Sequence, residues 1–175
     1  MSVIATLPDE LAGARERFDQ LYRSSAADVY AYVASLLRDR SAAEDVTALA
    51  FERAFRRRAL FDLRRGTPRA WLFAIARNAA LDELRRRRRV GALVGELADE
   101  SGLEDVDEAL AERRMLVREG LAALDARDRE VILLKFLGRL SNAELARVLR
   151  CSESNAGTRL HRAIERLREV CGVPR

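Results

Sequence analysis

Residues 152–168, SESNAGTRLHRAIERLR, combine a polar, basic side and an apolar side at helical spacing. Ala156, Leu160 and Ala163 recur at three- and four-residue steps, the spacing of a buried helical stripe. The side chains on or beside the other face have amide, hydroxyl, imidazole and guanidinium groups, which hydrogen-bond to base edges and phosphates. They are Asn155, Thr158 and Arg162, flanked by Arg159, His161 and Arg166, and the carboxylate of Glu165 lies on the same face. The pattern predicts a helix that can present these groups to DNA.

A second, shorter helix is predicted directly before it. Ser141 and Glu144 have the spacing of a capping box, and Ser152 is a good N-cap for the following helix. Two helices about three residues apart, the second basic on its exposed side, are typical of a helix-turn-helix whose second helix enters the major groove. These residues alone equally allow an ordinary helical hairpin with a solvated charged side.

Composition narrows the class of protein. The chain has 175 residues, enough for one or two small domains. Hydrophobic residues make up 49% of it and aromatic residues only 6%, which favours helices over sheet, and we predict an all-α fold. The net charge of +4 favours a polyanionic partner. Lys135 is the only lysine, an arginine bias that a GC-rich genome can also produce.

The sequence lacks the motifs that are typical of several functional classes. No apolar run is long enough to span a membrane, and the first ten residues do not form a signal peptide, so we predict no membrane insertion. Cys151 and Cys171 form no metal-ligand pattern, and we predict buried reduced thiols and no metal site. The chain has neither a glycine-rich phosphate loop nor a nucleophile motif, so we predict no cofactor and no enzymatic activity.

Apolar periodicity predicts three helices in the first half of the chain. They span residues 16–38, 41–57 and 69–89, with a polar loop over 61–68. Ser41 and Glu44 predict a capping box for the second helix, and Trp71 is interpreted as a core residue. The third helix ends in five arginines, Arg85 to Arg89, which suits either a phosphate-facing surface or a solvated helix end.

Residues 90–111 contain carboxylates and glycines but no arginine or lysine. Such a stretch cannot supply a core, so we predict a flexible acidic linker over residues 91–106. It would join a first lobe, residues 1–90, to a second lobe, residues 107–175, in which a turn at Asp125 precedes the apolar helix REVILLKFL.

Three motifs in this order resemble a bacterial RNA polymerase sigma factor of the extracytoplasmic-function (ECF) type. They are AAEDVTALAFERAFRR, PRAWLFAIARNAALDELRRRRR and, after the acidic linker, LDARDREVILLKFLGRLSNAELARVLRCSESNAGTRLHRAIERLR. The resemblance implies a transcription initiation factor that acts in the cytoplasm. Its first lobe would be sigma domain two, which binds the clamp helices of core RNA polymerase and the −10 element. Its second lobe would be sigma domain four, which binds the polymerase flap and the −35 element.

The resemblance also implies functional residues. Core polymerase contacts fall on Glu44, Asp45, Ala48, Leu49 and Glu52. Contacts to the −10 element and the DNA backbone fall on Arg64, Arg65, Arg77, Asn78, Arg85, Arg86, Arg87 and Arg88. Contacts to the −35 element fall on the five polar residues of 155–162 named above. Many members of the family are held inactive by an anti-sigma factor, which adds a third partner to core polymerase and promoter DNA.

The sequence departs from the family at several of these positions. Ala48 and Leu49 replace a glutamine and an acidic residue, and Gly157 replaces a basic residue of the reading helix. Arg150 stands where glycine is common, at a turn that favours a left-handed residue. The alternative function is a helix-turn-helix regulator that binds DNA without being a sigma factor; it would explain the second lobe but not the first.

Overall fold

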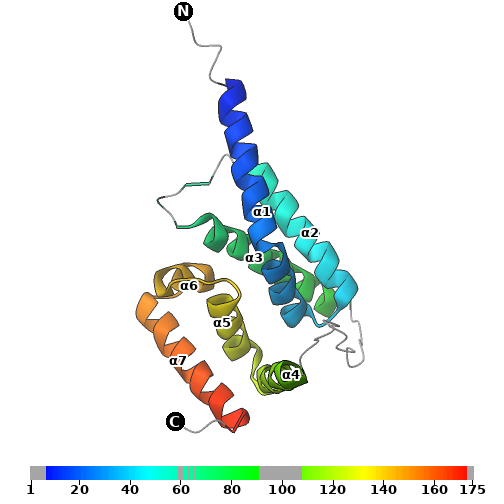
Figure 1. Ribbon diagram of the computed structural model, residues 1–175, viewed down its shortest axis with the longest axis vertical. Coiled ribbons are helices and arrows are strands. Elements are labelled where there is room, and N and C mark those ends of the chain that lie inside the picture. Colours follow the sequence, from blue (N-terminus) through cyan, green and yellow to red (C-terminus); the bar gives the residue numbers. More distant parts are fainter. Residues whose placement is uncertain (1–6, 59–60, 63, 65, 91–107, 173–175) are drawn as a thin grey trace, which may run out of the picture. The chain divides into compact units, whose positions relative to one another are not determined.

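The computed structural model describes residues 7–58, 61, 62, 64, 66–90 and 108–172, and these residues form seven helices and no β-strand (Figure 1). The chain divides into two compact units, Met1–Leu97 and Ala98–Arg175. The predicted all-α fold of two helical lobes is therefore confirmed. The predicted linker over residues 91–106 lies outside the described residues.

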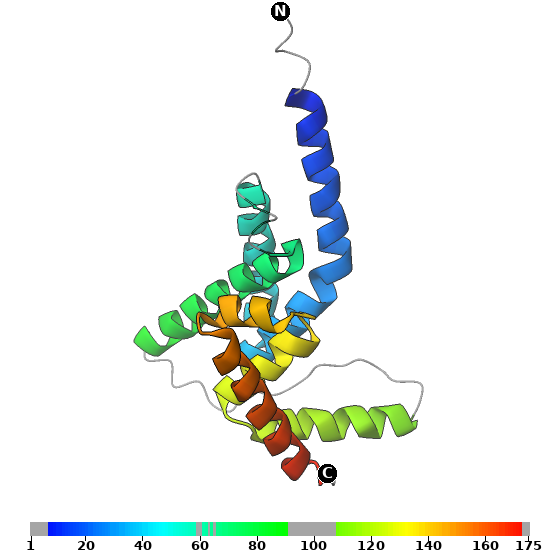
Figure 2. The ribbon, with the colours of Figure 1, turned by 90° about the vertical axis from the view of Figure 1, so that its left-hand side faces the viewer.

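The first unit is a bundle of three helices, α1 (Leu7–Leu37), α2 (Arg40–Arg57) and α3 (Pro68–Arg89), each packed against the other two (Figures 1 and 2). Its core contains Val29, Tyr32 and Val33 of α1, and Tyr32 packs against Phe73 of α3 with ring centroids 5.5 Å apart. Helix α1 begins earlier than predicted. Leu7, Leu11 and Phe18 have helical spacing in the sequence, and the helix predicted over residues 16–38 does not extend back to the two leucines.

The predicted capping box at the start of α2 is wrong. The N-cap is Asp39, whose carboxylate accepts a hydrogen bond from the Ala42 backbone N–H at 3.0 Å. An aspartate is as good an N-cap as a serine. Asp39 lies two residues before Ser41, so the helix begins before the predicted cap. Glu44 instead pairs with Arg40 at 3.1 Å, one helical turn away.

The start of α3 matches the prediction for Pro68, but the prediction for Trp71 is wrong. Thr67 caps the helix, and Pro68 occupies its first turn, where a missing N–H costs nothing. Trp71 is half-buried outside the core, and its ring packs on Phe61 of the preceding loop with centroids 5.2 Å apart. The residue therefore anchors the loop to the helix that follows it.

The second unit contains α4 (Glu108–Ala123), α5 (Ala126–Phe136), α6 (Asn142–Leu149) and α7 (Glu153–Val170), and the first three all contact α7. Its core is formed mainly by Val131 and Leu134 of α5, Leu145 of α6 and the apolar stripe of α7. Asp125 caps α5 at the predicted turn by accepting from the N–H groups of Arg127 and Asp128.

Helices α4 and α7 approach closely at Gly120, where an added Cβ would lie 2.6 Å from the Sγ of Cys171. Cys171 and Cys151 are both free thiols, and both are half-buried rather than buried as predicted. Cys171 follows the last turn of α7, and Cys151 lies in the turn before that helix.

Candidate nucleic-acid interface

Helices α6 and α7 form a helix-turn-helix whose ends are closed as the sequence predicts. Ser141 and Glu144 form a reciprocal capping box, with the Ser141 N–H donating to the Glu144 carboxylate at 2.9 Å and the Glu144 N–H donating to the Ser141 hydroxyl at 3.2 Å. Ser152 caps α7 by accepting from the Asn155 N–H at 3.2 Å. Between the helices, Arg150 adopts the left-handed conformation with φ 56°. The two serine caps fix where α6 and α7 begin, and Arg150 ends α6.

Helix α7 has a buried side and an exposed side, as its periodicity predicts. Ala156, Leu160 and Ala163 are buried against the other helices. Four of the five residues predicted to read DNA are exposed, namely Asn155, Thr158, His161 and Arg162. Arg159 is half-buried and lies toward the edge of this face. These exposed residues, within about three turns of the Ser152 N-cap, form the candidate reading surface.

Two polar contacts that sequence reasoning missed hold this surface in place. The single lysine, Lys135 of α5, donates to the Leu140 backbone oxygen at 3.0 Å and to the Asn142 side-chain oxygen at 3.1 Å, which fixes the turn before α6. The guanidinium of Arg166 pairs with Asp128 and so ties α7 to the start of α5. Neither contact could be found by sequence spacing, because each joins different helices.

The polymerase-binding prediction in the first unit falls on one exposed side of α2. Glu44, Asp45, Ala48, Leu49 and Glu52 are all exposed, and Leu49 retains 36% of its surface. The opposite side of α2 is the one that enters the core. An apolar centre with a carboxylate at each end suits a partner surface that is partly apolar and partly basic.

Aromatic side chains of α1 and α2 pack beside this exposed side. Phe18 lies 5.2 Å from Phe55 between ring centroids, and Tyr22 lies 4.7 Å from Phe51. Phe51 is buried, whereas Phe55 and Tyr22 expose 38% and 49% of their surfaces. Phe55 therefore belongs both to the packing of α1 on α2 and to the surface.

The loop before α3 and the first residues of α3 are anchored to α1. The Arg69 guanidinium pairs with Asp28 and donates to the Ser25 hydroxyl and to the Ser24 backbone oxygen, each at 3.1 Å. Only 18% of the Arg69 side chain is exposed. The partners are more than forty positions away in the chain, so no local sequence pattern predicts the contact.

The residues near Arg69 that are predicted to contact the −10 element differ in exposure. Arg64 and Asn78 are exposed, Arg77 is half-buried, and Arg65 lies outside the described residues. The Arg64 backbone N–H donates to the Asp62 carboxylate at 2.9 Å, which shapes the loop. Arg64 and Asn78 are therefore the accessible members of this set.

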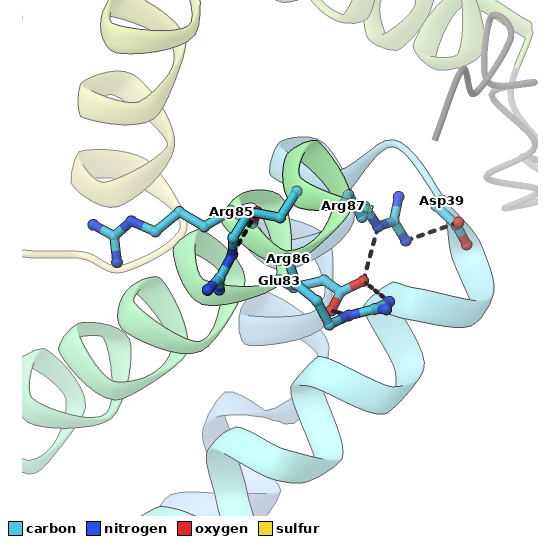
Figure 3. Close-up of polar contacts among 6 residues, drawn as sticks. Asp39, Glu83, Arg85, Arg86 and Arg87 are labelled. Carbon is cyan, nitrogen blue, oxygen red and sulfur yellow. Dashed lines mark hydrogen bonds and ion pairs between the residues drawn. The ribbon is translucent and has the colours of Figure 1, made fainter. Parts of the chain in front are cut away.

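The arginines at the end of α3 largely bind carboxylates of their own unit. Figure 3 shows Arg86 and Arg87 converging on Glu83, with Arg87 also reaching Asp39 at the start of α2. Arg86 forms a two-pronged pair with Glu83, both bonds 2.7 Å long, and Arg87 bonds Glu83 and Asp39 at 2.9 Å each. The hydrogen bonds from Arg86 and then Arg87 lower the pKa of Glu83 to about 2. Glu83 thus remains ionised at neutral pH and joins two arginines.

The five arginines therefore differ in availability. Arg87 exposes only 18% of its side chain, whereas 63% of Arg86 and 67% of Arg85 are exposed although both are paired. Arg88 is exposed, and within the part of the chain that the structure describes its guanidinium has no partner. Asp82, Glu83 and Asp39 offset part of the repulsion between these adjacent arginines.

Among the described residues, no group of three or more histidine, cysteine, aspartate or glutamate side chains could hold a metal ion. The same residues include no helix that is both long and apolar enough to cross a membrane.

Two known protein families match the chain, one in each unit. Residues 21–90 match the family described as Sigma-70 region 2, and residues 114–167 match Sigma-70, region 4. The chain is therefore a sigma factor with these two regions in order.

Individual relatives narrow the class. The chain is 35% identical over 154 residues to the ECF RNA polymerase sigma factor SigL of Mycobacterium tuberculosis, covering 85% of each chain. It is 32% identical to SigX of Bacillus subtilis, over 88% of this chain and 83% of SigX. It is 33% identical to BldN of Streptomyces coelicolor, over 89% of this chain but only 61% of BldN. The chain belongs to the ECF family of RNA polymerase sigma factors.

Two solved structures share the fold. The sigma factor RpoE of Bartonella quintana, in complex with the anti-sigma factor NepR, matches 91% of this chain and 99% of its own with a TM-score of 0.71 at 25% identity. CnrH, in complex with the cytosolic domain of CnrY, matches 94% of this chain and 96% of its own with a TM-score of 0.65, also at 25% identity.

Proposed function

We propose that this ECF sigma factor binds core RNA polymerase and directs it to promoters through −10 and −35 elements, assisting DNA melting. Residues 1–90 would form the domain that binds polymerase and the −10 element, residues 91–106 the linker, and residues 107–175 the domain that binds the −35 element. The observation that carries the proposal is the exposed side of α7, where Asn155, Thr158, His161 and Arg162 lie on a helix held by α6.

The polymerase contact is proposed for the exposed side of α2. Asp45 and Glu52 would face basic groups of the clamp helices, while Ala48 and Leu49 would pack against an apolar surface. Because apolar side chains occupy the centre of this face, the contact depends on shape and buried area there and on charge only at its edge. The flap contact is proposed for the second unit.

The −10 contact is proposed for the loop before α3 and for the exposed residues of α3. Arg64, Arg85, Arg86 and Arg88 would approach phosphates, and Asn78 has the amide needed to bond an unstacked base. Arg65 and Arg77 belong to the same proposed surface. For Arg87 we propose a positioning role, since its guanidinium is engaged by Glu83 and Asp39.

Further parts of the proposal concern regulation and place of action. An anti-sigma factor would bind the chain, as NepR binds RpoE of Bartonella quintana. The protein would act in the cytoplasm and would contribute binding rather than catalysis, since polymerase carries the chemistry. A helix-turn-helix regulator that is not a sigma factor is not favoured, because residues 21–90 match region 2.

The test is transcription by core polymerase reconstituted with the purified chain. The wild type should confer promoter-specific initiation, and Asp45→Arg should weaken core binding about tenfold or more by placing like charges opposite each other. Asp19→Arg, at an exposed aspartate of α1, is the matched control and should bind core normally with the same helical circular dichroism. A wild-type chain that neither binds core nor supports initiation would overturn the proposal.

A further inference from the structure

Three residues other than glycine have a positive φ in the described part of the chain, and all three are arginines. They are Arg38, Arg139 and Arg150, with φ between 50° and 56°. The left-handed conformation is unfavourable for a residue with a Cβ, and glycine would adopt it without this cost. Arg139 and Arg150 flank α6, one before each helix of the helix-turn-helix.

Arg139 gains no internal contact that offsets this cost. Its side chain is exposed, and it has no hydrogen-bond or ion-pair partner among the residues that the structure describes. Its neighbours are firmly held, since Leu140 is buried and its backbone oxygen accepts from Lys135 at 3.0 Å. A rigid turn thus presents an unpaired guanidinium to solvent.

This turn lies beside the reading surface of α7. Asn142, the first residue of α6, is held by Lys135 and has its side-chain nitrogen 4.0 Å from the position of a Cβ added at Gly157. Among the described residues no other heavy atom lies within 4 Å of that position, apart from Gly157 itself, its two chain neighbours and the α7 backbone within four residues. Gly157 immediately precedes Thr158, so Asn142, three positions after Arg139, borders the exposed side of α7.

We propose that Arg139 contacts a phosphate of the DNA that α7 reads. Glycine lets a bound backbone approach closely, so a phosphate at Gly157 would lie near Asn142 and the turn before α6. An arginine there supplies a positive charge and a fork of donors at a place where α7 itself has no side chain. The inference rests on the proposed −35 contact of α7.

An alternative explanation is that the positive charge of Arg139 only stabilises the C-terminal end of α5, as cations do at helix C-termini. The same account applies to Arg150 at the end of α6, which has the same conformation and is also exposed. Arg150→Gly is therefore a matched control: it removes the same charge and the same strain at the opposite end of an eight-residue helix.

The experiment measures binding of the reconstituted holoenzyme to promoter DNA across salt concentrations, together with the Tm of the free chain. Arg139→Gly should raise Tm by about 2–4 °C through relief of the positive φ. It should also weaken promoter binding about tenfold at low salt for every −35 sequence, and lower the slope of log K against log salt by about 0.9. Arg139→Lys should retain the salt slope. Arg150→Gly should raise Tm in the same way but bind DNA within about twofold of the wild type.

A second variant tests the position of the charge. Gly157→Arg in the Arg139→Gly background should restore affinity and salt slope, because it returns a guanidinium to the same space. Wild-type affinity and slope for Arg139→Gly would overturn the proposal, as would equal losses for Arg139→Gly and Arg150→Gly, which would indicate a general charge effect. Failure of the −35 assignment itself is distinguishable: Thr158→Ala and Arg162→Ala would then also leave promoter selectivity unchanged.

Discussion

Arg86 and Arg87 near the end of α3 and Arg162 on the exposed side of α7 have the same side chain but opposite surroundings. Arg86 and Arg87 bond Glu83, and Arg87 also bonds Asp39 across to α2. Arg162 of α7 is exposed, and none of the described residues pairs with it. A run of arginines is therefore a poor guide to which of them are free to bind phosphate, whereas exposure and carboxylate partners decide it.

The largest expected effect concerns the buried side of α7. A substitution there should change the stability of the second unit, whereas one on the exposed side should change DNA binding. Leu160 is only 9% exposed, so Leu160→Ala should destabilise the second unit by about 2–5 kcal/mol. The single tryptophan and all three tyrosines lie in the first unit, so fluorescence reports that unit and far-ultraviolet circular dichroism reports both. Urea unfolding should show an earlier circular dichroism transition with unchanged Trp71 fluorescence. A shift of the fluorescence transition by the same amount would contradict this separation.

Next in size is the loss of Arg87. Arg87→Ala removes bonds to Glu83 and Asp39 from a side chain that is only 18% exposed, and should destabilise the first unit by about 2 kcal/mol. Arg88→Ala is the control, because Arg88 is exposed: it should leave Trp71-detected unfolding unchanged and reduce the salt dependence of promoter binding by about one unit. If the two variants exchanged these effects, the division of the α3 arginines would be wrong.

A comparable or smaller effect is expected for Arg162 on the exposed side of α7. Arg162→Ala should cost about 1–3 kcal/mol in promoter binding and relax selectivity at one base pair if Arg162 bonds a base edge. Because Arg162 is exposed, the unfolding curve should not change. Binding of holoenzyme to a set of −35 variants measures this directly. Uniform weakening across all the variants would instead assign Arg162 to a phosphate.

The smallest effect is a pH dependence in the first unit. The folded pKa of Glu83, about 2, lies below its ordinary value of 4.5, so its ionised form stabilises the fold above about pH 4.5, and this contribution is lost as pH falls toward 2. Glu83→Gln should destabilise the unit by about 1–2 kcal/mol at neutral pH, a figure reduced for the exposure of Arg86. The difference from the wild type should shrink at about pH 3.

The matched control for this pH effect is Asp82→Asn. Asp82 pairs on the surface with Arg85 at 3.1 Å and with Arg53 at 3.8 Å, and all three side chains are more than one third exposed, so its replacement should change stability little at either pH. Trp71-detected urea unfolding at the two pH values gives all the required differences. A Glu83→Gln effect that grows on acidification would have the wrong sign for this ion-paired carboxylate.

The sequence by itself determined the helical fold class, most of the helices and the buried and exposed sides of α7. These follow from local rules: helical spacing places Ala156, Leu160 and Ala163 on one side, and Ser141, Ser152 and Pro68 mark helix starts through bonds within one turn. The exposed positions of the five α2 residues follow from the same periodicity.

The tertiary structure alone decided what depends on partners far along the chain. It placed Trp71 on the loop residue Phe61 and tied Arg69 and Arg87 to residues more than forty positions away. It also left Arg139 exposed and without a partner among the described residues, in a turn followed by Asn142, which lies beside Gly157. Helical periodicity shows which side a residue faces, but a charged side chain becomes structural or available only when packing brings a partner within hydrogen-bonding distance.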